Sequence, residues 1–328
     1  MILKHRPIPF LMTALLLVPA GATRAASASD NTKAAKPQAA AATKPDPATF
    51  DPVKYSKEVE TWREKRIAGL KREDGWLTLV GLYWLKPGEN RLGSDPGDPI
   101  LLPAGKAPAQ AGVLTREGDA VRLTVQPGVD LTADGKPATP GMKLETDVKG
   151  KPTLLQLGSL NFYVIQRGDR LGVRIKDKTS PMLAGFKGID EFPIRPEWRV
   201  EARFEPAKGK KIPIANIIGQ VEDSDSPGTV VFDWQGKTYR IDALEGGEDG
   251  SLFLVFGDRT NGSETYGAGR FLDTDPPKDG KVVVDFNTAY NPPCAFTAFA
   301  TCPLPPAQNK LAVRVEAGEK KFAGGGHP

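Results

Sequence analysis

The spacing of apolar residues predicts one helix close to residue 51. Asp51-Pro52 has the form of an N-cap followed by proline in the first turn, and Asp74-Gly75 marks the end. Between these points apolar residues recur every three to four positions, while acidic and basic residues fill the remaining positions. The stripe consists of Tyr55, Val59, Trp62, Arg66 or Ile67, and Leu70.

The rest of the sequence has the pattern of strands. GWLTLVGLYWL (residues 75–85) is apolar on both faces and predicts a buried strand or pair of strands. Further on, apolar and polar residues alternate in short segments separated by turn residues, and no helical pattern intervenes. This order predicts an all-β protein, an antiparallel barrel or two-sheet sandwich with one N-terminal helix. The alternating segments are 121–126, 160–166, 171–176, 198–204, 229–234, 237–241, 251–256, 265–272, 281–286 and 311–315.

The first 50 residues have a different composition. Residues 1–26 show the order of a signal peptide, with Lys4 and Arg6 before an apolar run and small residues after it. The run is too short and too interrupted by proline to be a membrane anchor, so we expect no transmembrane segment in the mature protein. Residues 27–50 predict a disordered Ala/Lys/Pro-rich linker, and residues 51–328 a single all-β domain. The expected location is periplasmic or secreted.

The charge balance argues against nucleic acid as a partner. The chain has 44 Lys and Arg and 40 Asp and Glu, of which six and two lie in the first 50 residues, which leaves 38 of each for the folded part. A balanced domain offers no electrostatic reason to bind a polyanion.

The scarcity of histidine excludes several chemistries. The two histidines are His5 and His327, at the two ends of the chain. Ser-His-acid and Cys-His catalysis and histidine-ligated metal sites are therefore absent from the predicted domain. The sequence also has no Walker A loop and no βαβ pattern. We therefore expect no cofactor and no metal site.

Cys294 and Cys302 are the two cysteines of the chain. In an exported protein such a pair favours an intrachain disulfide over a catalytic or metal-binding pair. The bond would fix a loop bracketed by prolines, and such fixed loops commonly carry binding groups.

Polar residues around this loop form the candidate site. TYGAGR places Tyr266 and Arg270 beside two glycines, which favours either a strand bulge or a close ligand approach. DFNTAYN places Asp285 and Asn287 on one face of a strand, followed by Tyr290 and Asn291. Asp285 paired with Arg270 would be a structural ion pair or a general acid/base.

Three other groups favour structural explanations. Arg167, Arg170, Arg174 and Asp177 have the pattern of a hairpin with solvated charges. Trp76 and Trp84 are interpreted as core aromatics, with a sugar-stacking platform as the alternative. The acidic DTDPPKDG segment is interpreted as a turn, since it lacks the length and glutamate of a calcium loop.

Four motifs together resemble the bacterial family catalogued as domain of unknown function 1684. They are GWLTLVGLYWLKPGENRLGSD, RGDRLGVRIKD, TYGAGRFL and DFNTAYNPPCAFTAFATCPLPPAQNKL, and the similarity extends over about residues 60–318. The resemblance implies a single domain whose signature includes Arg270, Asp285, Asn287, Tyr290, Asn291, Cys294 and Cys302. It implies no activity, since the family is uncharacterised.

The leading functional hypothesis is a periplasmic binding module for a polar small molecule or envelope saccharide. The ligand-binding residues would be Tyr266, Arg270, Asp285, Asn287, Tyr290 and Asn291. The first alternative is a histidine-independent hydrolase with Asp258 and Asp285 as its carboxylate pair, which requires the two groups roughly 5 to 9.5 Å apart. The second alternative is a structural or assembly protein of the envelope. The sequence identifies no protein partner.

Overall fold

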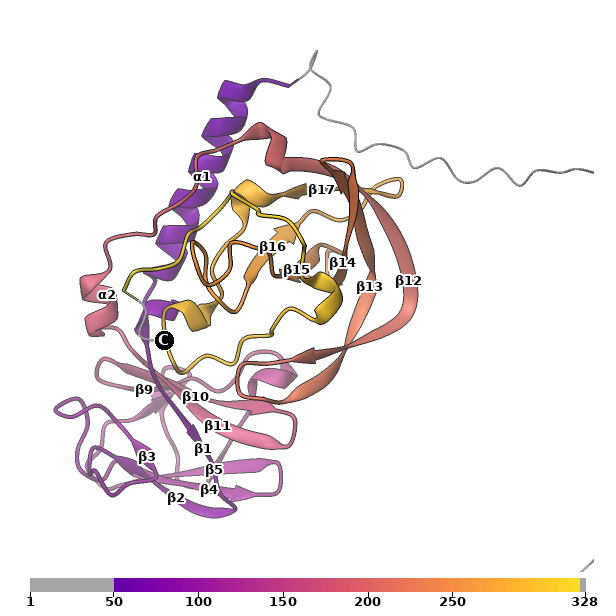
Figure 1. Cartoon of the computed structure of the whole chain (residues 1–328). Coiled ribbons are helices and arrows are strands. Elements are labelled where there is room, and N and C mark those ends of the chain that lie inside the picture. The colour runs from indigo at the N-terminus through magenta and orange to yellow at the C-terminus, as the bar shows by residue number, and fades with distance from the viewer. Residues whose placement is uncertain (1–49, 325–328) are drawn as a thin grey trace, which may run out of the picture. The chain divides into compact units, whose positions relative to one another are not determined.

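The computed structural model describes residues 50–324, in which α1 (Pro52–Leu70) is the first element (Figure 1). Asp51 caps the helix, because its carboxylate accepts the backbone N–H groups of Val53 and Lys54 at 2.9 and 3.1 Å. The predicted helix is thus present, and a second, short helix that the sequence did not predict follows later, α2 (Pro181–Gly185). No helix of this part of the chain is long and apolar enough to cross a membrane. The predicted signal peptide and, apart from residue 50, the linker lie outside the described residues.

Residues 79–177 form two sheets. Sheet 1 has the strand order β1–β11–β10–β9–β6–β7, and sheet 2 has the order β3–β2–β4–β5–β8. All their pairs are antiparallel except the short β2–β3 pair. The strands are β1 (Leu79–Trp84), β2 (Gly88–Gly93), β3 (Ile100–Leu101), β4 (Gly112–Glu117), β5 (Ala120–Val125), β6 (Thr132–Ala133), β7 (Lys136–Pro137), β8 (Met142–Leu144), β9 (Leu155–Leu157), β10 (Leu160–Arg167) and β11 (Arg170–Asp177).

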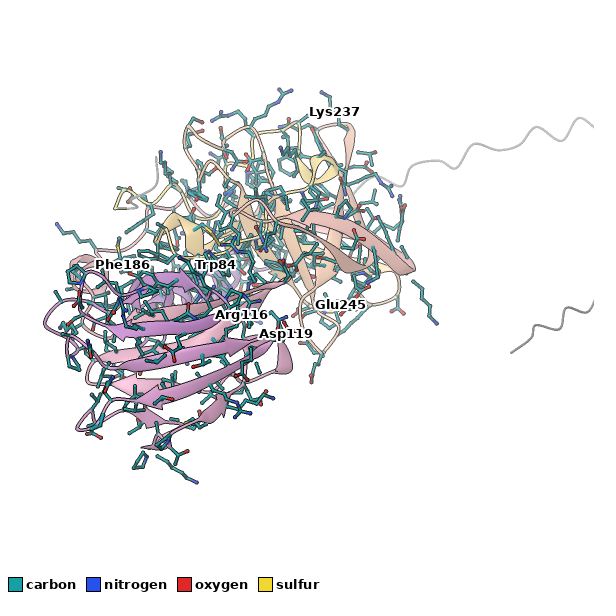
Figure 2. The ribbon with its side chains drawn as sticks, turned by 90° about the horizontal axis from the view of Figure 1, so that it is seen from below. Trp84, Arg116, Asp119, Phe186, Lys237 and Glu245 are labelled. Atoms are coloured by element: carbon teal, nitrogen blue, oxygen red, sulfur yellow. A yellow bond between two sulfur atoms is a disulfide. The ribbon has the colours of Figure 1, made fainter. Side chains whose placement is uncertain are left out.

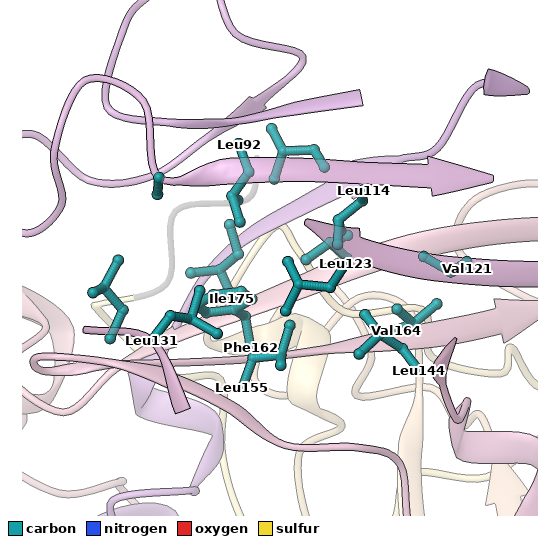
Figure 3. Close-up of a cluster of buried hydrophobic side chains, with 14 of the residues drawn as sticks. Leu92, Leu114, Val121, Leu123, Leu131, Leu144, Leu155, Phe162, Val164 and Ile175 are labelled. Carbon is teal, nitrogen blue, oxygen red and sulfur yellow. The ribbon is translucent and has the colours of Figure 1, made fainter. Parts of the chain in front are cut away.

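The two sheets enclose the first hydrophobic core, which Figure 3 shows in close-up. Leu114 and Leu123 of sheet 2 pack toward Phe162, Val164 and Ile175 of sheet 1, and all five side chains are buried. Alternate residues of a strand point to opposite faces. One face of sheet 1 therefore faces this core. The alternate residues of its strands lie on the opposite face, outside this core.

The second half of the chain forms one curved sheet, the half-barrel. Its strand order is β16–β15–β14–β13–β12–β17, and every pair is antiparallel. The strands curve around the C-terminal segment, drawn in yellow in Figure 1. They are β12 (Arg199–Ala215), β13 (Val221–Trp234), β14 (Lys237–Glu245), β15 (Leu252–Phe256), β16 (Arg270–Thr274) and β17 (Lys281–Asp285).

A second core fills the half-barrel and depends on aromatic residues. Phe286 is fully buried at its centre, with Trp198, Phe232 and Phe256 at ring-centroid distances of 5.5 to 5.8 Å. Such tilted and edge-to-face contacts stabilise aromatic clusters beyond the area that they bury.

The expected fold class is therefore confirmed, with a sandwich followed by a half-barrel. Three strand predictions were wrong in detail. In the predicted strand 75–85, Trp76–Thr78 forms a short 3-10 helix and the strand begins only at Leu79. Residues 265–269 form turns before β16 begins at Arg270, and Leu311–Val315 is no strand. In that last segment backbone groups pair singly, with Leu311 bonded to Gly257 and Arg259 to Val313. Alternation alone does not distinguish such a segment from a strand, since both bury every second side chain.

Candidate functional site

The predicted residue Arg270 lies in the interior of the half-barrel, at the start of β16. Its side chain has no solvent exposure, and it donates to Asp258 Oδ2 at 2.8 Å and to the Val315 carbonyl at 2.8 Å. It also donates to the Ala317 carbonyl. The other oxygen of Asp258 accepts the backbone N–H groups of Thr260 and Val315. Arg270 thus pairs with Asp258 rather than with Asp285, and the pair holds the C-terminal segment in place.

Asp285 and Asn287 hold α1 against the half-barrel. The Tyr55 hydroxyl donates to the Asp285 carboxylate at 2.9 Å and accepts from Asn287 Nδ2 at 2.8 Å. Asn287 also bonds both backbone groups of Arg195. Burial raises the pKa of Asp285, while its hydrogen bonds oppose the increase. The carboxylate is therefore occupied by structural partners.

The remaining predicted residues connect loops to one another. The Tyr290 hydroxyl donates to Asp273 Oδ2 at 2.9 Å, and Tyr266 donates to the Cys294 carbonyl at 3.2 Å. Asn291 is buried, its backbone N–H donates to Glu319 at 2.7 Å, and its amide donates to the Lys320 carbonyl. These contacts explain why polar residues are dense in this stretch without requiring a ligand.

The two cysteines are paired as predicted. Cys294 and Cys302 lie at disulfide distance with Cα atoms 6.2 Å apart, and both are buried. The bond closes the segment 294–302, called here the disulfide loop. This loop packs against β1, since the Thr297 hydroxyl donates to the Leu79 carbonyl at 3.1 Å.

A different group of residues meets beneath the disulfide loop, on the face of sheet 1 that points away from the first core. On β11, Val173 and Ile175 point into that core, so Arg174 and Lys176 point to the opposite face. The cationic site is defined here as Arg174, Lys176, Trp76, Tyr163 and Thr301.

Arg174 is buried without an ionic partner. It is 5% exposed, yet no carboxylate of the described residues lies within ion-pair distance. Its two hydrogen bonds are long, at 3.5 Å to the Tyr163 hydroxyl and 3.4 Å to the Thr301 hydroxyl. Its Nε atom is buried and has no partner at all. The prediction of solvated charges on this hairpin was wrong for Arg174 and for Asp177, which are 5% and 4% exposed. The disulfide loop lies against Arg174 through Thr301, and Asp177 accepts from Thr179.

Lys176 brings a second positive charge to the same place. It is 8% exposed and, like Arg174, forms no ion pair with a carboxylate of residues 50–324. Its ammonium group donates to the backbone carbonyl of Asp74. Burial, followed by the charge of Arg174, lowers the pKa of Lys176 from 10.5 to about 8, against the attraction of the Asp74 carboxylate. Two cations thus share a partly dry site, in which the charge of Arg174 disfavours the protonated form of Lys176.

Half-buried aromatic residues flank the two cations. The Trp76 ring centroid lies 5.3 Å from Arg174 Cζ and 5.4 Å from Lys176 Nζ, and the Tyr163 ring lies 6.0 Å from Lys176 Nζ. Trp76 contacts the hydrophobic cluster around the disulfide, as expected for a core aromatic, but it retains partial exposure. Trp84 instead stacks on Arg170 at 3.8 Å and lies over Gly172 (Figure 2).

The sequence pointed to part of this site. It placed Arg174 in a group of hairpin charges and Trp76 in a separate aromatic pair with Trp84, whereas Lys176, Tyr163 and Thr301 were missed. Strand alternation does place Lys176 beside Arg174 on one face of the predicted hairpin. No local signal connects that face with Thr301, which lies 127 residues further along the chain.

Comparisons with known proteins identify a family without an activity. Residues 184–320 match the family model described as "Protein of unknown function (DUF1684)", which confirms the family resemblance for this part of the chain. The chain is similar to an uncharacterised protein of Haloarcula marismortui solved by NMR in solution, with 31% sequence identity and a TM-score of 0.36. That similarity covers 42% of this chain and 78% of the other. None of the curated proteins matches this chain.

Proposed function

We propose that the protein is an exported binding module for a polar small molecule, and that the ligand binds at the cationic site. The observation that carries this proposal is the burial of Arg174 and Lys176 without a carboxylate partner. A buried charge is costly unless it is paired, and folded proteins rarely leave one uncompensated. A ligand would supply the missing partner.

The surroundings of the two cations suit a binding site. Aromatic faces beside a few hydrogen-bonding groups are typical of sites for polar ligands such as sugars. Trp76 and Tyr163 provide the faces, and the Thr301 hydroxyl provides a hydrogen-bonding group. The buried Asn161, opposite Lys176 in the pairing of β10 with β11, brings an amide to the same face. The disulfide supports the export part of the proposal, since such bonds persist in oxidising compartments.

The hydrolase alternative receives less support. Asp258 is buried against Arg270, and Asp285 is engaged by Tyr55 and Asn287. A general acid or base must reach a substrate proton. Neither carboxylate has a free oxygen placed for that role.

The test is ligand binding by the purified full-length chain. We would screen neutral and acidic monosaccharides by thermal shift and confirm each hit by calorimetry. A ligand present at 100 times its Kd should add about 2.7 kcal/mol to the free energy of unfolding. The gain should be lost in Lys176→Met and kept in Lys237→Met, because Lys237 is an exposed lysine at the start of β14 (Figure 2). A hit that both variants retain would place the binding elsewhere and refute this assignment.

A further inference from the structure

We infer that Arg174 and Lys176 form an oxyanion subsite, which selects ligands that carry a carboxylate or phosphate group on a sugar-like ring. This inference rests on the proposed function and makes it more specific. It names the charge of the ligand and the atoms that recognise it.

The unused donors of Arg174 define the recognition element. Its Nε is buried without a partner, and the adjacent Nη2 has only the 3.4 Å contact to Thr301. Nε and one terminal nitrogen form an edge with two parallel N–H groups. That edge matches two oxygens of a carboxylate or phosphate, which gives both strength and a fixed orientation.

The local charge favours an anion over a neutral ligand. Within the described part of the chain, Arg174 and Lys176 both lack ion-pair partners, whereas the nearby Arg167 pairs with Asp147 at 2.8 Å. The carboxylate of Asp74 attracts Lys176. That carboxylate already forms an ion pair with the guanidinium of Arg72, at 2.8 Å. An incoming oxyanion would therefore meet two positive charges, neither of which forms an ion pair with a carboxylate of the described residues.

The aromatic flank explains why a ring should accompany the anionic group. Trp76 lies within 5.4 Å of both cations, so a ligand whose anion contacts Arg174 would place its neighbouring atoms along the indole. The C–H face of a sugar ring packs well on such an aromatic surface. The ligand class is thus a uronate or a sugar phosphate.

The experiment uses three ligands that share one ring. Glucose, glucuronate and glucose 6-phosphate differ in the group at C6, and inorganic phosphate tests the anion alone. We would titrate each into the full-length protein by calorimetry at low and moderate salt. At least one charged sugar should bind ten times or more as tightly as glucose, and the preference should weaken as salt rises. The ratio between glucuronate and glucose 6-phosphate distinguishes a carboxylate from a phosphate as the natural group.

Variants test the assignment to the two residues. Arg174→Met and Lys176→Met should each lower the affinity for the charged sugars until it approaches the affinity for glucose. Lys237→Met, the control, should leave these affinities unchanged. Arg174→Lys keeps the charge but loses the planar edge, so it should fall between the wild type and Arg174→Met. Circular dichroism and melting curves establish that each variant is folded.

The outcomes separate this inference from the proposed function. Equal affinity for glucose and the charged sugars, with all of them lost in Lys176→Met, would overturn the oxyanion subsite and leave the binding module intact. Charged sugars that bind Arg174→Met as well as the wild type would also overturn it. If a neutral compound of the screen binds and no anionic probe does, the oxyanion subsite is refuted and the binding module is not. If no compound binds, both proposals are refuted.

Discussion

Arg174 and Arg270 are two buried arginines whose replacement should have opposite effects on stability. Arg270 is 0% exposed and is paired with Asp258, whereas Arg174 is 5% exposed and unpaired. We would replace each with Met, which has a similar apolar stem. If Arg174 is retained for a ligand rather than for folding, only the Arg270 variant should be severely destabilised.

The loss in free energy of unfolding expected for Arg270→Met follows from the contacts of the Arg270 side chain. The substitution leaves Asp258 buried without its counterion and frees the carbonyls of Val315 and Ala317. Breaking a buried pair from one side typically destabilises a protein by about 3–5 kcal/mol. We expect a loss of stability in this range.

The balance for Arg174→Met is different. The variant loses two long hydrogen bonds, worth about 0.5 kcal/mol each at most, and a cation–π contact of roughly 0.5–1 kcal/mol. It gains relief from burying an unpaired guanidinium, a cost of several kcal/mol. It also relieves Lys176, whose lowered pKa, about 8 instead of 10.5, corresponds to roughly 3 kcal/mol from all causes together. The gains match or exceed the losses, so Arg174→Met should be neutral or stabilising.

The assay is urea unfolding of the two variants and the wild type, with thermal melts in parallel. The free energies of the variants should differ by about 3 kcal/mol or more, or roughly 6–12 °C in Tm for a protein of this size. If Arg174→Met is destabilised as strongly as Arg270→Met, Arg174 is a structural residue. The proposal of a ligand at the cationic site would then be refuted.

Three further predictions concern pH, the disulfide and the attachment of α1. Because the folded state lowers the pKa of Lys176 to about 8, its destabilising effect is complete below pH 8, and stability should rise by up to roughly 3 kcal/mol between pH 8 and 10.5. Urea titrations across this range should show no such excess in Lys176→Met, and an identical profile would contradict the pKa. Replacing Cys294 and Cys302 by Ser should remove about 2.5 kcal/mol, the loop entropy of nine residues, and unchanged urea midpoints would argue that the loop is fixed by packing alone. Tyr55→Phe removes one of the donors of the half-buried Asp285 carboxylate, which keeps its hydrogen bonds from Asn287, and should destabilise the protein by about 1–3 kcal/mol. An unchanged urea midpoint would show that the Asn287 donors suffice.

Local sequence patterns were sufficient for most of the secondary structure. The N-cap of Asp51 and the hairpin turn at Gln235-Gly236 are set by neighbouring residues, and both positions of that turn have positive φ, 49° and 76°. The family resemblance and the cysteine pairing were likewise readable from short motifs.

Packing between distant segments was not readable in the same way. Arg270 lies in a segment whose composition is typical of a binding site. Its partners Asp258 and Val315, however, lie 12 and 45 residues away along the chain. Only the folded chain shows that the segment of Asp258 and the C-terminal segment 315–317 converge on its guanidinium. The same holds for Arg174, since the disulfide loop that buries it lies more than a hundred residues later. The role of a polar residue thus depends on which distant segment of the chain packs over it. A single sequence does not show which distant segments come into contact.

The attachment of α1 has a consequence for the order in which the chain can fold. Tyr55 bonds Asp285, 230 positions away, and Arg66 bonds Glu319 at 3.0 Å, 253 positions away. A ribosome therefore completes the helix long before it makes either partner. Contacts of such high sequence separation slow folding, because the long intervening loop must be closed before they form. A nascent chain shorter than about 320 residues would leave the apolar stripe of α1 uncovered, where a chaperone or a translocation machine could hold it.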